Sequence, residues 1–187
     1  MKDAPLNPMS EKPLLILDLD ETLISAQMAS LDRPPDFRVG PYFVYLRPHL
    51  AEFLARCSGA YRLAVWTSSS EDYANAVVEQ IARHGARFEF VWARGRCTRR
   101  FDRETLDQFW LKDLKKVRRL GYALERVLVV DDSSEKLQRH YGNHVHITPY
   151  FGEAQDDELS RLASYLESLA SEPDFRAIEK RNWRARN

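Results

Sequence analysis

The chain has 187 residues, a length that suits one domain with a substantial hydrophobic core. Its 28 Lys and Arg residues balance 28 Asp and Glu residues, so no overall charge draws it to nucleic acid or to a membrane surface. The two cysteines argue against a disulfide framework or a zinc site, and no apolar run is long enough to span a membrane. The first residues lack the apolar stretch of a secretory signal. We therefore expect an intracellular, cytoplasmic protein, or a nuclear one if the source is eukaryotic.

Residues 1–12 read as a flexible polar lead, and the first strand is expected directly after them. Residues 14–17 are Leu-Leu-Ile-Leu, an apolar run typical of a strand that is buried on both faces. Asp18 and Asp20 follow this strand, and Thr22 stands two positions further on. Because open α/β sheets bind ligands at the carboxyl ends of their strands, we expect these carboxylates to lie in a binding site. An ordinary acidic turn that closes a strand is the alternative.

The pattern Asp-x-Asp-x-Thr after a buried strand is what an aspartyl-phosphate phosphotransferase needs. Asp18 would attack phosphorus, and the resulting acyl phosphate divides one difficult displacement into two easier ones. Asp20 would protonate the leaving oxygen and then deprotonate water, while its main-chain carbonyl would join Asp18 in binding Mg²⁺. Thr22, beside the substrate, would hold this turn by hydrogen bonds from its side chain to the main chain.

The chain between residues 26 and 92 contains two predicted helices and three predicted strands. Residues 26–40 are rich in Pro and Asp and read as a loop. The apolar patterns after this loop predict strands over 42–46, 62–66 and 88–92 and helices over 47–57 and 70–84. The strand over 62–66 ends in Thr67 and Ser68, so it carries hydroxyl groups at its carboxyl end.

The second half of the chain repeats this alternation. Residues 93–111 lack clean periodicity and read as a loop or a small insertion. The elements expected after them are a basic helix over 112–120, a buried strand over 126–130, a helix to about residue 141, a strand over 145–147 and an amphipathic helix over 156–169. We assign residues 13–170 to a single domain and residues 171–187 to a charged tail that can form a helix.

Strands that alternate with helices predict a three-layer, doubly wound α/β fold with a mainly parallel sheet. The carboxyl ends of parallel strands lie at one edge of the sheet. Asp18, Thr67 and the pair Asp131 and Asp132, which follows the strand over 126–130, should therefore meet there. Two adjacent carboxylates repel each other, and a divalent cation makes that arrangement tolerable. A role in capping the next helix is the alternative for this pair.

With these motifs in order, the chain resembles the haloacid-dehalogenase (HAD) superfamily of phosphotransferases. It is most similar to the FCP/SCP group, the phosphatases of the RNA polymerase II carboxy-terminal domain and their NLI-interacting-factor-like relatives. The resemblance runs from about residue 13 to residue 170, and it implies a Rossmann-like HAD core with only small cap insertions. Five segments carry it, at residues 17–23, 46–50, 66–68, 111–114 and 129–133.

The resemblance implies a role for each matching residue. Thr67 would donate its hydroxyl to a phosphate oxygen, and Ser68 would lie beside it in the substrate site. Lys112 would stabilise negative charge on the nucleophile and on the phosphate. Asp131 and Asp132 would hold Mg²⁺ together with Asp18 and Asp20.

A cluster of arginines lies in the segment between the second and third motifs. Arg94, in the pattern Arg-x-x-Cys, matches a position that the family uses near the substrate. An arginine cluster beside a phosphotransfer site can grip phosphate or acidic flanking residues bidentately. A solvent-exposed basic loop remains open for the other four, and a nucleic-acid patch fits poorly with a neutral chain. The cluster consists of Arg94, Arg96, Arg99, Arg100 and Arg103.

Asp20 favours the hydrolysis of phosphoesters, because the resemblance implies that dehalogenases and transport ATPases lack an Asp at this position. The segments 23–41 and 93–111 are too short to bury a core of their own, so we expect an open site. An open site suits a phosphate displayed on a large partner, and a Mg²⁺-dependent protein phosphatase is the expected function. Two alternatives stay open: a phosphatase or phosphotransferase of small metabolites, and a non-catalytic protein-binding module on the same fold.

Overall fold

The computed structural model describes residues 12–101 and 108–186. Apart from Lys12, the lead predicted over residues 1–12 lies outside the described residues, as do residues 102–107 of the predicted insertion. Within the two described ranges, no helix combines the length and the apolar character needed to cross a lipid bilayer.

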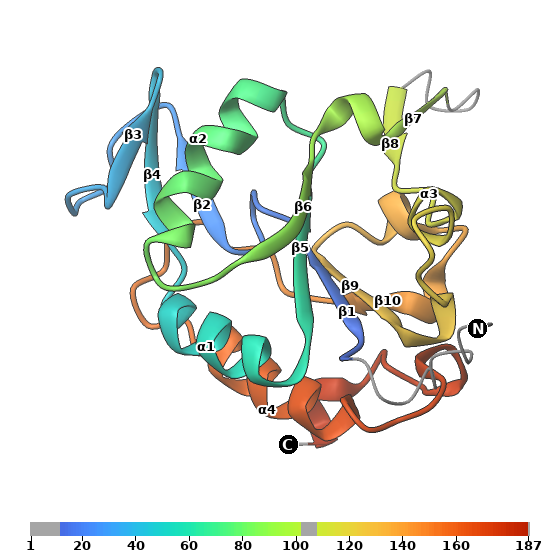
Figure 1. Ribbon diagram of the computed structural model, residues 1–187. Helices are drawn as coiled ribbons and strands as arrows, with labels where there is room; N and C mark the ends of the chain where they lie inside the picture. The colour runs from blue at the N-terminus through green and yellow to red at the C-terminus, as the bar shows by residue number, and fades with distance from the viewer. Residues whose placement is uncertain (1–11, 102–107, 187) are drawn as a thin grey trace, which may run out of the picture.

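A parallel sheet of five strands forms the centre of the molecule (Figure 1). Its strand order is β10-β9-β1-β5-β6, so that β1 pairs with β9 on one side and with β5 on the other. Every residue of β1 and β9 is buried, as expected for apolar strands covered on both faces. Five of the six expected strands thus form this sheet. They are β1 (Leu14–Leu17), β5 (Arg62–Trp66), β6 (Phe88–Trp92), β9 (Val127–Asp131) and β10 (His144–His146).

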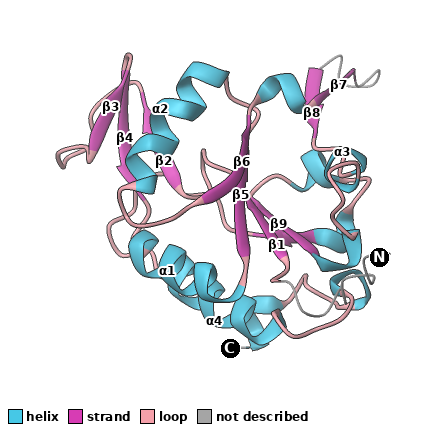
Figure 2. Cartoon of the chain, viewed as in Figure 1, coloured by secondary structure: helices cyan, strands magenta, loops and turns pink. Residues whose placement is uncertain are grey.

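Successive residues of these strands point to opposite faces, and each face packs against its own hydrophobic core. Leu15 and Leu17 of β1 belong to a cluster with side chains of α1 (Leu50–Ala60), α2 (Glu71–Ala82) and α4 (Glu158–Leu169). Leu14 and Ile16 belong to a second cluster, which includes Val117 of α3 (Lys115–Arg118). Figure 2 shows helices on both sides of the central strands. The predicted three-layer α/β fold is confirmed.

A second, antiparallel sheet stands beside the carboxyl edge of the central sheet and corrects two predictions. It consists of β2 (Ile24–Gln27), β4 (Tyr42–Leu46) and β3 (Phe37–Val39), in that order. The loop predicted over residues 26–40 therefore contains half of β2 and the whole of β3, and the strand predicted over 42–46 lies outside the parallel sheet. β3 and β4 are joined by two residues, of which Gly40 has a φ of 55°. Glycine at such a turn permits a tight hairpin. This signal is present in the sequence, but the segment was predicted to be a loop.

The segment after β6 also differs from the prediction. The loop expected over residues 93–111 contains a short 3₁₀ turn, η1 (Arg94–Arg96), and the antiparallel pair β7 (Thr98–Phe101) and β8 (Gln108–Leu111). The helix expected from Lys112 begins only at Lys115. The main-chain N–H of Lys112 donates instead to the carbonyl of Lys136, at 2.8 Å, which ties Lys112 to the edge of the central sheet.

Beyond β9 the chain forms short 3₁₀ turns where one helix was expected. They are η3 (Ser134–Leu137) and η4 (Tyr141–Asn143), and a similar turn, η2 (Leu124–Arg126), precedes β9. The polar run that opens this segment uses its hydrogen bonds locally, because the N–H of Ser133 donates to the side chain of Asp131 at 2.9 Å.

The charged tail packs on the domain. It forms η5 (Phe175–Ala177) and η6 (Trp183–Arg186), and the side chains of Phe175 and Trp183 are completely buried in the larger core cluster. The indole N–H of Trp183 donates to the carbonyl of His146 in β10, at 2.8 Å. Phe175 and Trp183 of the tail therefore contribute to the hydrophobic core of the domain.

Candidate active site

The polar ends of three neighbouring strands meet at one edge of the central sheet. Asp18 follows β1, Thr67 follows β5, and Asp131 is the last residue of β9. The main chain continues the sheet at two of these positions, because the N–H of Asp18 donates to the carbonyl of Val130 at 3.0 Å and the N–H of Thr67 to that of Trp92 at 2.8 Å. Residues that are far apart in the sequence thus form a single site, as the parallel sheet predicted.

Two lysines neutralise the carboxylate of Asp18. The Nζ atom of Lys112 lies 3.1 Å from Oδ1 of Asp18, and the Nζ atom of Lys136 lies 2.8 Å from Oδ2. Burial by itself would raise the pKa of Asp18, but the two ammonium groups outweigh it and lower the pKa below its ordinary value. The side chain is therefore an ionised carboxylate at neutral pH, which is the form that can attack phosphorus.

Lys112 is buried between two carboxylates. Besides its contact with Asp18, its Nζ atom lies 2.5 Å from Oδ2 of Asp131. The position of Lys112 directly after β8 and its hydrogen bond to the main chain of Lys136 direct the side chain into the site. The structure thus brings together Asp18, Asp131 and the lysine that sequence reasoning placed with them.

Three carboxylates are close enough to share a cation. One oxygen atom from each of Asp18, Asp131 and Asp132 lies within 4.8 Å of the other two. Oδ1 of Asp132 is buried without a hydrogen-bond partner, and burial raises the pKa of this carboxyl group. A hard divalent cation with oxygen ligands would satisfy such an atom, so this set of residues fits Mg²⁺. Asp131 is further held by its main-chain carbonyl, which accepts a hydrogen bond from Nε2 of His144 at 2.9 Å.

Asp20 lies in the turn that follows β1, and two hydroxyl groups donate to its side chain. Oδ2 accepts a hydrogen bond from the hydroxyl of Ser69 at 2.7 Å, and Oδ1 accepts one from the hydroxyl of Tyr73 at 2.5 Å. Burial outweighs these two hydrogen bonds and raises the pKa of Asp20. A carboxyl group with a raised pKa holds a proton more readily, which suits a general acid.

The hydroxyl of Thr22 does not make the main-chain hydrogen bond that was expected of it. Its hydroxyl is buried and has no hydrogen-bond partner, and it does not line the pocket described below. The turn is held by the main chain instead, because the N–H groups of Thr22, Leu23 and Ile24 all donate to the carbonyl of Leu19. In this tight turn around the Leu19 carbonyl, the Thr22 side chain is buried in the protein.

A pocket of about 480 Å³ opens in front of Asp18. The predicted residues Asp20, Thr67, Ser68 and Arg94 line it. The N–H of Ser69 donates to the hydroxyl oxygen of Thr67 at 3.1 Å, so the Thr67 O–H is left to donate elsewhere. The remaining lining residues are Glu21, Ala26, Tyr42, Ser69, Ser70, Tyr73 and Lys136.

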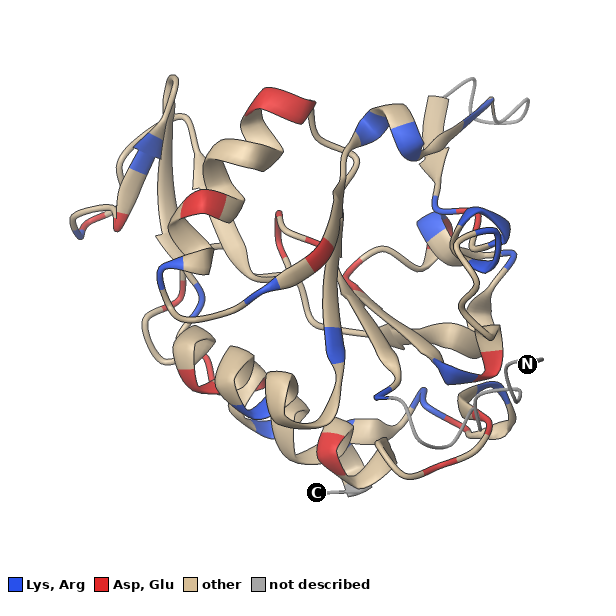
Figure 3. Ribbon diagram, viewed as in Figure 1, with Lys and Arg blue, Asp and Glu red and all other residues tan. Residues whose placement is uncertain are grey.

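The arginine cluster is divided by the structure. Nε of Arg94 donates to the carbonyl of Ser68 at 2.7 Å, which holds this side chain at the pocket. Arg96 packs over the ring of Trp92, and Arg99 and Arg100 lie exposed on β7. Arg103 lies outside the described residues. Figure 3 shows basic positions on η1 and further ones around α3.

Sequence reasoning missed several residues that line the pocket, among them Lys136, Tyr73 and Glu21. The carboxylates of Asp18 and Asp131 outweigh burial and raise the pKa of Lys136. Burial, together with the charges of Asp20 and Asp132, raises the pKa of Glu21 to about 7. A sequence signal existed for Glu21, which follows Asp20 directly. Lys136 and Tyr73 lie on helical turns after strand ends, where only the fold shows which way a side chain points.

Comparison with known proteins agrees with these motifs. Residues 13–176 match the family described as NLI interacting factor-like phosphatase. The chain is 32% identical to CTD nuclear envelope phosphatase 1 of Xenopus tropicalis, over 95% of this chain and 78% of that protein. It is 30% identical to the human carboxy-terminal domain RNA polymerase II polypeptide A small phosphatase 1, over 90% of this chain and 64% of that protein.

A solved structure shares the fold. A variant of the fission yeast RNA polymerase II CTD phosphatase Fcp1, bound to beryllium fluoride, superimposes with a TM-score of 0.65 at 20% identity, over 86% of this chain and 63% of that chain. The predicted HAD core is thereby confirmed. The chain belongs to the NLI interacting factor-like phosphatases, the FCP/SCP-like group of HAD-type phosphoric monoester hydrolases.

Proposed function

We propose that this protein is a Mg²⁺-dependent phosphatase that removes phosphate from a phosphorylated protein through an aspartyl-phosphate on Asp18. The observation that carries the proposal is the convergence on one buried carboxylate. Asp18 lies within 3.1 Å of Lys112 and within 4.8 Å of both members of the Asp131–Asp132 pair, and it faces a pocket. Ionised nucleophile, positive charge and metal-binding oxygens are the components that phosphoryl transfer requires.

The reaction follows from the protonation states of two carboxyl groups. A carboxylate oxygen of Asp18 bonds to phosphorus while the bond from phosphorus to the substrate oxygen breaks, and Asp20 gives its proton to that departing oxygen. In the second step Asp20 takes a proton from water, whose oxygen bonds to phosphorus as the acyl-phosphate bond breaks. Asp18 and inorganic phosphate are released. The raised pKa of Asp20 and the lowered pKa of Asp18 match these two roles.

Charge on the phosphate oxygens needs partners in the site. Mg²⁺, held by Asp18, Asp131 and Asp132 and by the main-chain carbonyl of Asp20, would neutralise part of this charge. Lys112 would stabilise the rest from behind Asp18. The hydroxyl of Thr67 would donate to a phosphate oxygen, and Ser68 and Arg94 line the same pocket.

Two features support a phosphoprotein as the substrate. Among the residues that the structure describes, the two insertions form small antiparallel sheets, β2-β4-β3 and β7-β8, which are too small to enclose a substrate under a folded cap. The names of the relatives describe phosphatases of a protein domain. A site without a folded cap can accept a phosphorylated loop or tail of a protein substrate. An intracellular location stays a prediction that fits the two buried, unpaired cysteines, and cell fractionation would test it.

Substitution of the two acidic residues tests the mechanism. We expect Asp18→Asn and Asp20→Asn each to lower the hydrolysis of p-nitrophenyl phosphate by at least about 100-fold. The exposed Asp157→Asn serves as the control and should leave turnover unchanged. EDTA should abolish activity and Mg²⁺ should restore it, and beryllium fluoride should inhibit as an acyl-phosphate mimic. Wild-type turnover by Asp18→Asn would contradict the mechanism.

A substrate panel tests the second half of the proposal. Phosphoserine, phosphothreonine and phosphotyrosine peptides should be hydrolysed with higher kcat/KM than sugar or nucleotide phosphates. The reverse order would favour a small-metabolite phosphatase. Turnover of none of these phosphoesters, together with tight binding to a protein, would favour a non-catalytic binding module.

A further inference from the structure

Lys136 occupies a position that the reaction does not explain. Its Nζ atom lies 2.8 Å from Oδ2 of Asp18, 3.5 Å from Oδ1 of Asp131 and 3.8 Å from Oδ1 of Asp132. These are the three carboxylates whose oxygens are close enough to share a divalent cation. A side-chain ammonium group thus lies among the same acidic residues that would hold the metal.

The ammonium and a divalent cation cannot both lie there. Mg²⁺ binds its oxygen ligands at about 2.1 Å and demands near-octahedral geometry, so the ion would lie between the three carboxylates. Lys136, unlike Lys112, approaches all three carboxylates: it hydrogen-bonds to Asp18 and lies 3.5 and 3.8 Å from Asp131 and Asp132, so its ammonium group would then lie a few ångströms from a doubly charged ion. The repulsion between them and the competition for the same lone pairs make the two arrangements mutually exclusive.

The two lysines of the site differ in their freedom to move. Lys112 has no exposed side-chain surface and is fixed between Asp18 and Asp131. The Lys136 side chain is 20% exposed, and it lines the pocket. Its main chain is held, because its carbonyl accepts the hydrogen bond from Lys112, whereas its long side chain can turn into the pocket without a change in the fold.

We infer that Lys136 is an internal competitor of the catalytic cation: its ammonium group neutralises the three carboxylates and must withdraw into the pocket when the divalent ion binds. Lys136 then sets the affinity of the site for metal, and the withdrawn ammonium faces the place where a substrate phosphate binds. This inference rests on the proposed function, since it needs the metal site formed by Asp18, Asp131 and Asp132.

Direct metal binding tests the inference without reference to turnover. Mn²⁺ binding is measured by electron paramagnetic resonance for the wild type, Lys136→Met and the control Lys115→Met, an exposed lysine of α3. We expect Lys136→Met to bind Mn²⁺ about tenfold more tightly or better, the equivalent of one charge-assisted hydrogen bond that no longer has to be broken. Lys115→Met should bind as the wild type does. Unchanged or weaker binding by Lys136→Met would overturn the inference.

A second measurement uses the wild-type protein and so does not depend on the folding of a variant. The ammonium groups of Lys112 and Lys136 are followed by ¹⁵N NMR of the lysine side chains during titration with Mg²⁺. The Lys136 signal should broaden as the group moves into solvent, while the Lys112 signal should persist. A Lys136 signal that keeps its intensity at saturating Mg²⁺ would contradict withdrawal.

One further variant separates this inference from the proposed function. Asp132→Asn should weaken Mn²⁺ binding strongly. If Asp132→Asn and the wild type bind Mn²⁺ equally, the metal site itself is wrongly assigned, and the proposed function fails with it. If Asp132→Asn loses binding while Lys136→Met binds as the wild type does, only the competition by Lys136 is refuted.

Discussion

At the scale of single residues, the state of each acidic group depends on what donates to it. Asp18 receives two ammonium groups, which keep its pKa low in spite of burial. Asp20, two positions away, receives two hydroxyl groups instead, and burial raises its pKa. Hydroxyl groups carry no charge and therefore offset less of the cost of burying a carboxylate. Neighbouring carboxyl groups thus differ in how readily they hold a proton, which suits the proposed nucleophile and the proposed acid.

Tyr73 positions the acid, and its removal should affect substrates unequally. Tyr73→Phe deletes the hydroxyl that donates to Oδ1 of Asp20 and leaves the ring in place. We expect kcat for phenyl phosphate, whose leaving group needs a proton, to fall about tenfold. The effect on p-nitrophenyl phosphate should be clearly smaller, because its leaving group departs without full protonation.

A series of aryl phosphates with different leaving groups provides this measurement. The exposed Tyr141→Phe is the matched control and should follow the wild type across the series. An equal loss on all substrates would mean that Tyr73 acts on the shape of the site rather than on the acid.

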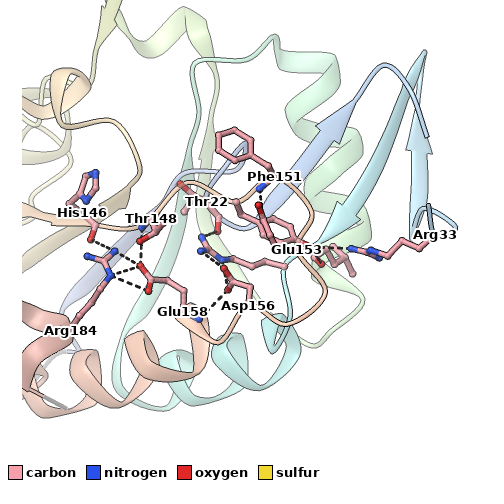
Figure 4. Close-up of polar contacts among 12 residues, drawn as sticks. Thr22, Arg33, His146, Thr148, Phe151, Glu153, Asp156, Glu158 and Arg184 are labelled. Atoms are coloured by element: carbon pink, nitrogen blue, oxygen red, sulfur yellow. Dashed lines mark hydrogen bonds and ion pairs between the residues drawn. The ribbon is translucent and has the colours of Figure 1, made fainter. Parts of the chain in front are cut away.

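Arg47 is a buried residue that donates a hydrogen bond to the turn after β1. Its guanidinium donates to both carboxylate oxygens of Asp156, at 2.9 and 2.8 Å, and to the carbonyl of Thr22 at 3.1 Å. Figure 4 shows Thr22 and Asp156 on either side of this contact. The turn after β1 is thereby connected to the segment that leads into α4.

Loss of this buried pair should cost more than loss of an exposed one. Arg47→Met leaves Asp156 without its partner, and we expect the free energy of unfolding to fall by about 3 kcal/mol. Arg56→Met removes a similar bidentate pair with Glu167 at the surface, where the loss should stay within about 1 kcal/mol. Urea unfolding of both variants measures the difference, and equal losses would contradict the role of burial.

At the scale of elements, a residue in the first turn of α4 binds η6 to the rest of the domain. Glu158 accepts a hydrogen bond from the N–H of Thr148 at 2.9 Å and pairs with the guanidinium of Arg184 (Figure 4). Burial would raise the pKa of Glu158, but these two donors outweigh it and lower the pKa below its ordinary value of 4.5. One carboxylate thus connects α4, the segment after β10 and η6.

The lowered pKa of Glu158 makes this connection dependent on pH. The unfolded chain binds a proton at Glu158 more readily than the folded chain does. The free energy of unfolding therefore rises with pH in the range where Glu158 titrates. The contribution is complete above about pH 4.5 and is lost as the pH falls through the lower pKa of the folded state. Glu158→Gln should flatten the unfolding free energy between about pH 6 and pH 3. Glu153→Gln, at an exposed carboxylate, should keep the wild-type slope, and an equal slope for both variants would refute this explanation.

The elements that sequence reasoning missed share a physical cause. β2 and β3 are four and three residues long, too short for a period of two to stand out. They are stabilised by pairing with β4, a contact that forms only when the chain returns at Gly40. The strands β1, β5 and β9 of the central sheet were recognised because their apolar residues are continuous rather than alternating with polar ones.

At the scale of the whole molecule, the last residues complete the core. The ring of Trp183 stacks on Tyr165 of α4, with 5.6 Å between centroids, and the ring of Phe175 lies 6.3 Å from that of Tyr61 at the end of α1. The larger of the two cores therefore includes side chains from the charged tail.

Removal of Trp183 should destabilise the entire domain. We expect Trp183→Ala to lower the free energy of unfolding by about 3–5 kcal/mol, because a completely buried indole leaves a cavity and its hydrogen bond to His146 is lost. Tyr141→Ala, at a largely exposed aromatic side chain, is the control and should change little. Chemical denaturation followed by circular dichroism measures both. A small loss for Trp183→Ala would show that the tail is dispensable.

The sequence alone determined the parallel sheet and most of its site. Apolar runs that end in Asp18, Thr67 and Asp131 are local patterns, and a parallel sheet has only one edge at which such ends can meet. Lys112 was placed by its motif even though the predicted helix begins only at Lys115. Local pattern and topology were sufficient for these residues.

Tertiary structure decided the rest. The direction in which Lys136 and Tyr73 point depends on how a turn after a strand packs, and no local pattern records that. The burial of Trp183 depends on a contact with β10 and α4, which lie earlier in the chain. Side-chain direction and long-range packing arise only when distant segments meet, and for that reason the second lysine of the site and the core residues of the tail could not be read from the sequence.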